Sequence, residues 1–147
     1  MSQNDRQTNW IQIFILCLAG GTIFILPYLR YGYYDAMIAS LGITNTQLGT
    51  IMAAYGAFTL PSYLIGGFLA DRFPARNLLV FSFLSTALGG FYLMTNPGYT
   101  GTLLIHGFWG ISTVLTFWAA YFKIVRLSAA TENQGKIFGI VNGGRRE

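Results

Sequence analysis

Charged residues are scarce in this 147-residue sequence, at 10% of the total, whereas typical soluble domains have about 25%. Hydrophobic residues make up 53%. A soluble domain of this size would have too few charged side chains to cover its surface. The composition therefore excludes an ordinary soluble protein and predicts an integral membrane protein in contact with the lipid bilayer.

Cysteine and histidine are almost absent, with one residue of each. Cys17 has no partner for an internal disulfide, and no Cys/His cluster indicates a metal site. The five acidic residues are scattered, and no glycine-rich phosphate loop occurs. We therefore expect no enzyme active site, no metal and no cofactor. The net charge of +4 comes from dispersed basic residues, which argues against nucleic acid as a partner.

Apolar stretches long enough to cross a bilayer as helices recur along the chain. The sequence predicts an all-α membrane bundle, with a cytoplasmic tail at residues 1–9 and a partial transmembrane domain at 10–147. The expected spans cover residues of about 11–35, 46–70, 77–95 and 102–123, and an incomplete fifth helix begins at about 134.

Local signals refine these spans. The first helix is expected to continue past Pro27, and Thr44 or Asn45 is a suitable N-cap for the second. Three glycines near the end of the sequence repeat every four residues, which predicts a tightly packed helix face: Gly135, Gly139 and Gly143.

Basic residues predict the orientation of the four spans. The turn at residues 95–101 contains no Lys or Arg. If the chain crosses four times, six basic residues fall on the opposite side: Arg6, Arg72, Arg76, Lys123, Arg126 and Lys136. The positive-inside rule then places both termini in the cytoplasm and the turn outside.

The short charged turn between the second and third spans has an unusual pattern. Asp71 lies at the C-terminal end of a predicted helix, where the helix dipole makes a carboxylate unfavourable, so it needs a cation or another helix N-terminus nearby. Gly67 lies four residues earlier on the same face, where it would let a neighbouring backbone approach closely. Pro74 cannot continue the helix but suits the start of the next one.

The pattern Gly67-x-x-x-Asp71-Arg72-x-x-x-Arg76 resembles the loop signature between helices two and three of the major facilitator superfamily of secondary transporters. Pro74 stands where that signature has glycine, and Asn77 where it has a second basic residue. The resemblance implies a multi-pass bacterial inner-membrane protein with twelve helices in two halves. It also implies a gating role for the loop, in which Asp71 meets a C-terminal half that is missing here. We expect Asp71 to pair with a basic residue that ends the fourth span, Lys123 or Arg126.

Arg30 is the strongest candidate for substrate binding, because an arginine in a bilayer costs at least about 2.5–3.5 kcal/mol. Tyr33 and Tyr34 lie three and four residues later, on the same face of an intact helix. Its guanidinium matches the geometry of carboxylate and phosphate groups. The alternative is that Arg30 reaches the outer interface, where its charge costs little.

Further matches extend the resemblance to the organophosphate:phosphate antiporters and related organic-anion transporters. They are Tyr28-Leu29-Arg30, Ala36-Met37, Gln47-Leu48-Gly49 and Ala54-Tyr55-Gly56. In that branch an arginine on the first helix binds the anionic group of the substrate. The resemblance implies the same role for Arg30. Tyr34, one turn later, is expected to be an auxiliary donor. Arg145 and Arg146 are second candidates, because an extended fifth helix would place them within the membrane, with a frayed polar terminus as the alternative. Tyr31 replaces the usual next basic residue, which leaves a sugar acid or another organic anion open, with a proton or a counter-anion as the coupling species.

Two functions from different classes follow. The first is the N-terminal portion of a secondary transporter that moves a small organic anion by alternating access, which the unfinished fifth helix favours. The alternative is a small four-helix membrane protein that acts as a non-transporting subunit or scaffold. His106, in the fourth span, is expected to be a packing or interface residue, with a proton carrier as the alternative.

Overall fold

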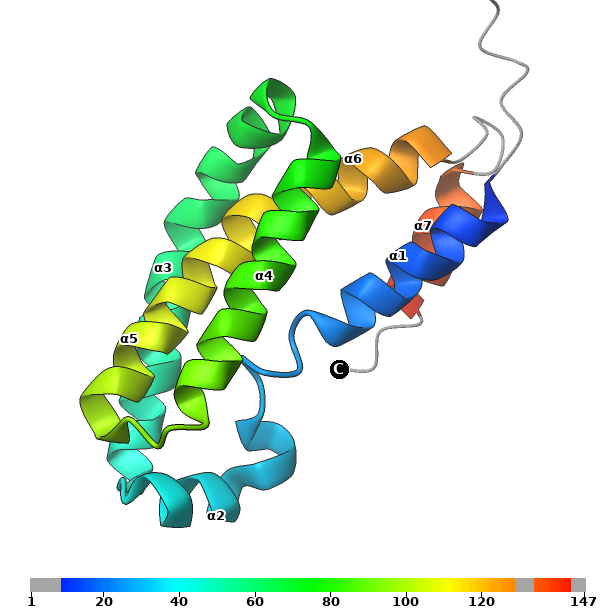
Figure 1. Ribbon diagram of the computed structural model, residues 1–147. Coiled ribbons are helices and arrows are strands. Elements are labelled where there is room, and N and C mark those ends of the chain that lie inside the picture. The colour runs from blue at the N-terminus through cyan, green and yellow to red at the C-terminus, as the bar shows by residue number, and fades with distance from the viewer. Residues whose placement is uncertain (1–8, 129–133, 144–147) are drawn as a thin grey trace, which may run out of the picture.

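The computed structural model describes residues 9–128 and 134–143, and every regular element in these ranges is a helix (Figure 1). This confirms the all-α prediction for the described residues. The predicted tail at 1–9 lies outside them except for Asn9. The elements are α1 (Trp10–Thr22), α2 (Arg30–Leu41), α3 (Asn45–Arg72), α4 (Ala75–Leu93), α5 (Gly98–Ile111), the π-helix η2 (Ser112–Trp118), α6 (Ala119–Ser128) and α7 (Gln134–Gly143).

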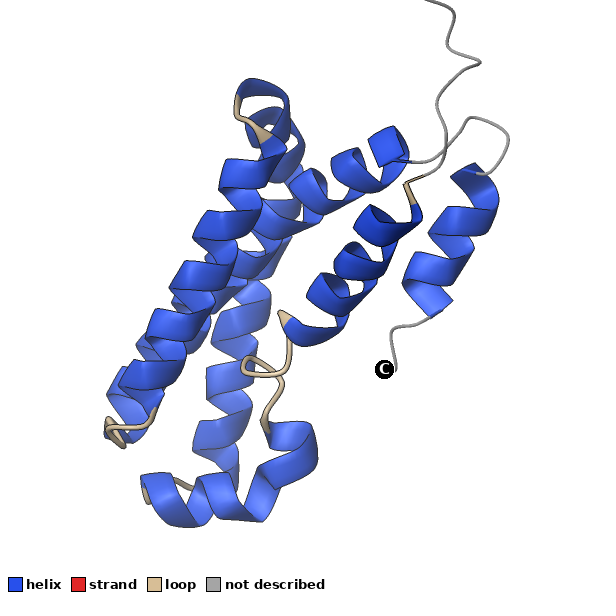
Figure 2. Cartoon of the chain, turned by 45° about the vertical axis from the view of Figure 1, so that its right-hand side comes forward, coloured by secondary structure: helices blue, strands red, loops and turns tan. Residues whose placement is uncertain are grey.

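The centre of the structure is a bundle of α3, α4 and the continuous helix formed by α5 and η2, while α1 and α7 lie side by side next to α6 (Figures 1 and 2). The largest fully buried side chains are Trp109 on α5 and Phe117 on η2. Glycines allow the close contacts. The Trp109 indole fills the space beside Gly89 on α4, and Gly110 lies against the backbone carbonyl of Tyr55 on α3.

The ends of α3 follow directly from its sequence. Thr44 caps the helix, since its hydroxyl accepts from Gln47 N at 3.2 Å while the Gln47 side chain accepts from Thr44 N at 2.9 Å. This reciprocal capping box satisfies two amide groups that would otherwise lack partners. At the other end, Phe73 leaves the helical conformation directly before Pro74, which disfavours a helical residue ahead of it. The predictions of an N-cap at Thr44 and a stop at Pro74 are confirmed.

The first predicted span differs from the structure. Instead of one helix over residues 11–35, α1 ends at Thr22, turns occupy residues 23–29, and α2 begins at Arg30. Pro27 lies inside this turn segment, where its missing N–H cannot take part in a helical ladder. Local hydrogen bonds, between residues three or four apart in the sequence, still satisfy part of the backbone. Tyr28 N donates to the Phe24 carbonyl at 3.0 Å, and Leu29 N donates to the Leu26 carbonyl at 3.2 Å. We therefore correct the expectation that the helix continues past Pro27.

Two helices in the described part of the chain are long and apolar enough to cross a membrane, Asn45–Arg72 and Gly98–Leu127. The second contains η2, a seven-residue π-helix, and begins earlier than the predicted span at 102–123. Helix α1 is apolar but shorter. Four spans therefore remain a prediction, although α4 fills most of the expected third span.

Helix α7 begins where the fifth segment was expected, at Gln134. Ile137 of α7 is buried and packs in one cluster with Ile13 and Leu16 of α1. Gly135 and Gly139 are exposed, and a side chain added at either would meet nothing within 4 Å among the described residues. The tight packing predicted for this glycine face therefore remains a prediction.

Candidate functional site

Arg30 is the first residue of α2, directly after the turn segment at 23–29, and its side chain is half-buried. Its Nη2 donates to the Tyr31 hydroxyl at 3.3 Å, and its guanidinium carbon lies 4.8 Å from the centroid of the Tyr31 ring. Its Nε is buried and has no hydrogen-bond partner in the described structure. A buried donor of a charged group normally has a partner, so the unpaired Nε is the feature of Arg30 that needs a physical explanation.

A row of tyrosine rings leads from Arg30 into the bundle. The ring of Tyr28 lies 5.7 Å from that of Tyr31 and 5.5 Å from that of Tyr55, in tilted and edge-on arrangements. The Tyr55 hydroxyl lies 3.2 Å from the Thr113 hydroxyl. Thr113 itself donates to the Trp109 carbonyl at 2.6 Å, so the Tyr55 hydroxyl is the donor of the pair. The row brings together the turn segment, α2, α3 and η2, and sequence spacing did not reveal it.

Tyr34 does not join this row. Its hydroxyl donates to Asn45 Oδ1 at 3.1 Å, at the start of α3. The reason is a kink inside α2, where Tyr33 has φ −134° and ψ 39°, far from helical values. An i, i+4 relation holds only on an intact helix, so the predicted proximity of Arg30 and Tyr34 loses its geometric basis. The second candidates for substrate binding lie outside the described residues: Arg145 and Arg146.

The charged turn between α3 and α4 places its residues at the surface. Gly67, Asp71, Arg72 and Arg76 are all exposed, and the Arg72 guanidinium lies 4.9 Å from the centroid of the Phe68 ring. The close backbone approach expected at Gly67 occurs one residue earlier. Gly66 is buried, and a Cβ added there would lie 3.2 Å from the Leu115 carbonyl oxygen of η2.

Lys123 of α6 reaches the end of α3 that carries Asp71. Its Nζ donates to the Ala70 carbonyl at 2.7 Å, which satisfies one of the free carbonyls at a helix C-terminus. The cation thus compensates the negative end of the α3 dipole through the backbone. The pairing of the Asp71 carboxylate with Lys123 or Arg126, and the gating role of the turn, remain predictions.

His106 is buried on α5, with 1% of its surface exposed. Its Nδ1 lies 2.8 Å from the Thr102 carbonyl, and its ring meets that of Trp109 edge-on at 4.9 Å between centroids. These contacts agree with a packing residue. Among the described residues no group of three or more His, Cys, Asp or Glu side chains lies close enough together to hold a metal ion.

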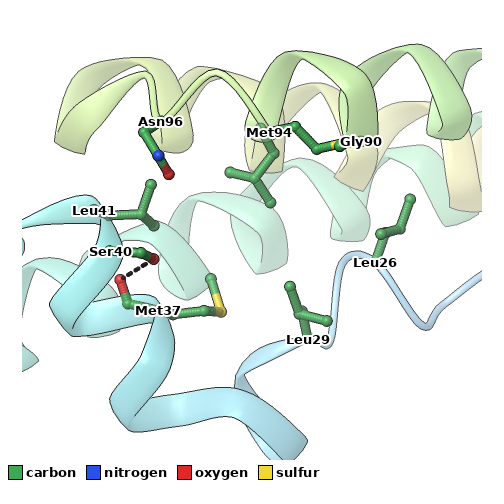
Figure 3. Close-up of a pocket in the computed structure, with 9 residues that line it drawn as sticks. Leu26, Leu29, Met37, Ser40, Leu41, Gly90, Met94 and Asn96 are labelled. Carbon is green, nitrogen blue, oxygen red and sulfur yellow. Dashed lines mark hydrogen bonds between the residues drawn. The ribbon is translucent and has the colours of Figure 1, made fainter.

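A separate cavity of about 220 Å³ lies between α2, the turn segment and the end of α4 (Figure 3). Its walls are mostly apolar, and the Ser40 hydroxyl in its lining already donates to the Met37 carbonyl at 3.4 Å. The described residues that line it include no ionisable side chain. The cavity therefore offers no charge that would bind an anion.

The described helices expose many large apolar side chains on their outer surfaces, where a lipid bilayer would cover them. This is the pattern of a helical membrane protein. Comparison with known proteins assigns the family, because the sequence profile of the Major Facilitator Superfamily matches residues 8–145. The chain belongs to this superfamily, whose members are in general transporters and not enzymes. The finer resemblance to the organophosphate:phosphate antiporters remains a prediction.

Individual relatives cover nearly all of this chain. It is 34% identical over 137 residues to the inner membrane protein YihN of Escherichia coli. The aligned region covers 93% of this chain and 32% of that protein. It is 33% identical over 141 residues to the inner membrane protein YqcE of the same organism, covering 96% of this chain and 33% of that protein. An uncharacterised protein of Mycoplasma pneumoniae is 34% identical over 148 residues, covering 94% of this chain and 31% of that protein.

The chain thus spans about a third of the length of the curated relatives it matches. No solved structure shows a significant match to this chain.

Proposed function

We propose that this chain is the N-terminal part of a bacterial inner-membrane secondary transporter that moves a small organic anion by alternating access. The observation that carries the proposal is the half-buried Arg30, whose buried Nε has no partner among the described residues. A charge in a membrane protein without a partner of opposite sign is a functional-site candidate, because burying it is costly. A bound anion would supply the missing partner.

The helix break supports the same location. Transporters commonly bind their substrates beside interrupted helices near the interface of two structural repeats. Arg30 directly follows such an interruption, at residues 23–29. The proposal includes the rest of the N-terminal half, a C-terminal half, and coupling of transport to a proton or a counter-anion.

The test uses the complete gene product, reconstituted in liposomes and supplied with labelled organic anions. Saturable uptake is expected in the wild type. Losing a charge-assisted hydrogen bond costs about 1.5–3 kcal/mol, so Arg30→Ala should weaken apparent affinity by roughly one to two orders of magnitude. Arg30→Lys should restore part of it, since an ammonium lacks the planar fork of donors.

Lys136→Ala is the matched control, because it removes one exposed cation from α7. It should leave affinity unchanged. Liposomes that contain only residues 1–147 should show no saturable uptake, since the substrate site of this architecture lies between two halves. Equal affinities for Arg30→Ala, Lys136→Ala and the wild type for every anion would return Arg30 to an interface role and remove the basis of the proposal.

A further inference from the structure

The π-helix η2 holds one residue more than an α-helix would need to cover the same stretch. A π turn closes between residues five apart, whereas an α turn closes between residues four apart. Helices α5 and α6 continue from the two ends of η2, so η2 sets the register between them. If η2 closed into an α-helix, each residue of α6 would advance by one position, a rotation of about 100° and a rise of about 1.5 Å. Phe122 would then take the place of Lys123.

The hydrogen bonds at the start of η2 are unevenly distributed. The Ser112 carbonyl accepts from the Ser82 hydroxyl at 2.9 Å and from the Thr116 hydroxyl at 2.5 Å. Ser112 Oγ and Trp109 Nε1, in contrast, are buried and have no partner among the described residues. Only 1% of Ser112 and 0% of the Trp109 surface are exposed, so parts of the protein outside the described ranges do not reach them.

These two groups leave hydrogen-bonding capacity unused inside the bundle. Water does not fit between Trp109 Nε1 and Gly89 of α4, because even a Cβ added at Gly89 would clash with this nitrogen. Buried polar groups normally have partners, and a local arrangement that leaves them unpaired costs free energy. Together with the rarity of π-helices, this cost indicates that the π form of η2 is close in energy to another arrangement.

Helix α6 places adjacent residues against different neighbours. Lys123 reaches the end of α3, where its Nζ donates to the Ala70 carbonyl at 2.7 Å. The ring of Phe122 stacks on that of Phe138 of α7, at 5.9 Å between centroids. An advance of α6 by one residue would withdraw Lys123 from the carbonyl and bring Phe122 to it. The negative end of the α3 dipole, directly before Asp71, would then lose its cation.

We propose that η2 is a conformational switch, which closes into an α-helix and reopens and thereby turns α6 between two registers at the end of α3. In the register of the structure Lys123 caps α3, and in the other register this contact is broken. Gly66 gives the backbone of η2 room to change, because it presents no side chain to the Leu115 carbonyl that lies against it. The inference goes beyond the proposed function, since it concerns how the helices move and not what they bind.

Deletion of Leu115 tests the switch in the complete gene product, with Cys17 replaced by serine. An α-helix that lacks this residue reaches α6 in the register of the structure and has no extra residue to release. Phe73→Cys, exposed at the end of α3, is combined with Lys123→Cys to report this register, or with Phe122→Cys to report the other. A short bifunctional thiol reagent links each pair.

Without the deletion, both pairs should cross-link. With the deletion, the pair that contains Lys123→Cys should react as before, whereas the pair that contains Phe122→Cys should react at least about tenfold more slowly, because its register is no longer populated. Equal reaction of the Phe122→Cys pair with and without the deletion, or no reaction of this pair in either case, would overturn the switch.

Deletion of Leu84 is the matched control, since this leucine is 59% exposed and lies in the middle of the regular helix α4. Its loss should turn part of the buried face of α4 outward and lower the melting temperature. Deletion of Leu115 should leave the melting temperature equal or higher, because it removes only the extra residue of η2. An equal fall in both deletion variants would contradict the register argument.

Hydrogen exchange tests the wild type without any substitution. The backbone amides of residues 113–118 should exchange faster than those of α5, although both segments lie in the core. Equally slow exchange in the two segments would show a single rigid helix and overturn the switch. None of these measurements needs a substrate, so a failure of the proposed anion transport leaves the switch standing, and a failure of the switch leaves anion binding at Arg30 untouched.

Discussion

Two adjacent glycines on α3 provide a direct test of the helix packing. Gly66 is buried, and a Cβ added there would lie 3.2 Å from the Leu115 carbonyl oxygen and 3.6 Å from the Leu115 Cα. Gly67 is exposed, and an added Cβ would meet nothing within 4 Å in the described structure. The structure therefore assigns the close contact to Gly66, whereas the loop signature assigns it to Gly67. Making the same substitution at each position shows which assignment is correct.

The expected magnitudes follow from two opposing effects. Replacing glycine by alanine inside a helix gains about 0.8–1 kcal/mol of intrinsic propensity. At Gly67 nothing opposes this gain, so Gly67→Ala should stabilise the chain by nearly that amount. At Gly66 the new methyl group must displace a backbone carbonyl by a few tenths of an ångström, which should cancel most of the gain. Gly66→Leu should overpack the contact between α3 and η2 and destabilise the chain by about 1–3 kcal/mol.

The assay is reversible unfolding of the chain in mixed detergent micelles, with the free energy of unfolding measured for each variant. Gly67→Leu is the matched control and should be close to neutral for this part of the protein. A larger loss of stability in Gly67→Leu than in Gly66→Leu would refute the packing of α3 against η2. It would also return the close contact to the position that the loop signature indicates.

Three further predictions concern the hydroxyl pair, the turn and the topology. Tyr55→Phe should cost about 0.5–1.5 kcal/mol. Thr113→Val should cost about 1–3 kcal/mol, because it removes both buried hydrogen bonds of the Thr113 hydroxyl, to the Tyr55 hydroxyl and to the Trp109 carbonyl; equal losses of unfolding free energy would contradict this. Asp71→Asn in the complete protein should slow uptake with little change in calorimetric affinity, because it alters an equilibrium between states; unchanged uptake would exclude a gating role. In a background without the native cysteine, Asn96→Cys should react with an impermeant reagent in intact cells and Ala75→Cys should not, and the reverse labelling would invert the orientation.

Helix ends were predictable because they depend on short-range chemistry. The Thr44 cap needs only a glutamine three residues later, and the end of α3 needs only a proline after Phe73. Low charge and apolar length likewise identified a membrane protein without any tertiary information. These signals act within a few residues or through overall composition, so a single sequence contains them completely.

The buried face of each helix could not be predicted in the same way. In a soluble protein, the polar face of a helix reveals its buried side. Here the exposed side is also apolar: Leu64 of α3 is 86% exposed, while Ile51 of the same helix is fully buried. The periodicity of hydrophobic residues therefore carries little information about how each helix is rotated about its own axis. This explains why Gly66 and Gly67 could not be told apart, and why the row from Tyr31 to Tyr55 was missed.

The interruption of the first span also explains why the candidate site contains other residues than expected. Proline in an apolar segment indicates a disturbance, but neither its length nor the new direction of the chain follows from the sequence. In the structure the turn segment brings the ring of Tyr28 against Tyr55, and the kink at Tyr33 directs the hydroxyl of Tyr34 to Asn45. Sequence spacing assumed an intact helix, and the kink removes the geometric reason for placing Tyr34 beside Arg30, so its role as an auxiliary donor remains a prediction. Irregular backbone in a membrane protein is tolerated where it is buried in protein or lines a water-filled cavity. The cavity beside this break is mostly apolar, so the break alone does not assign a function to the arginine that follows it.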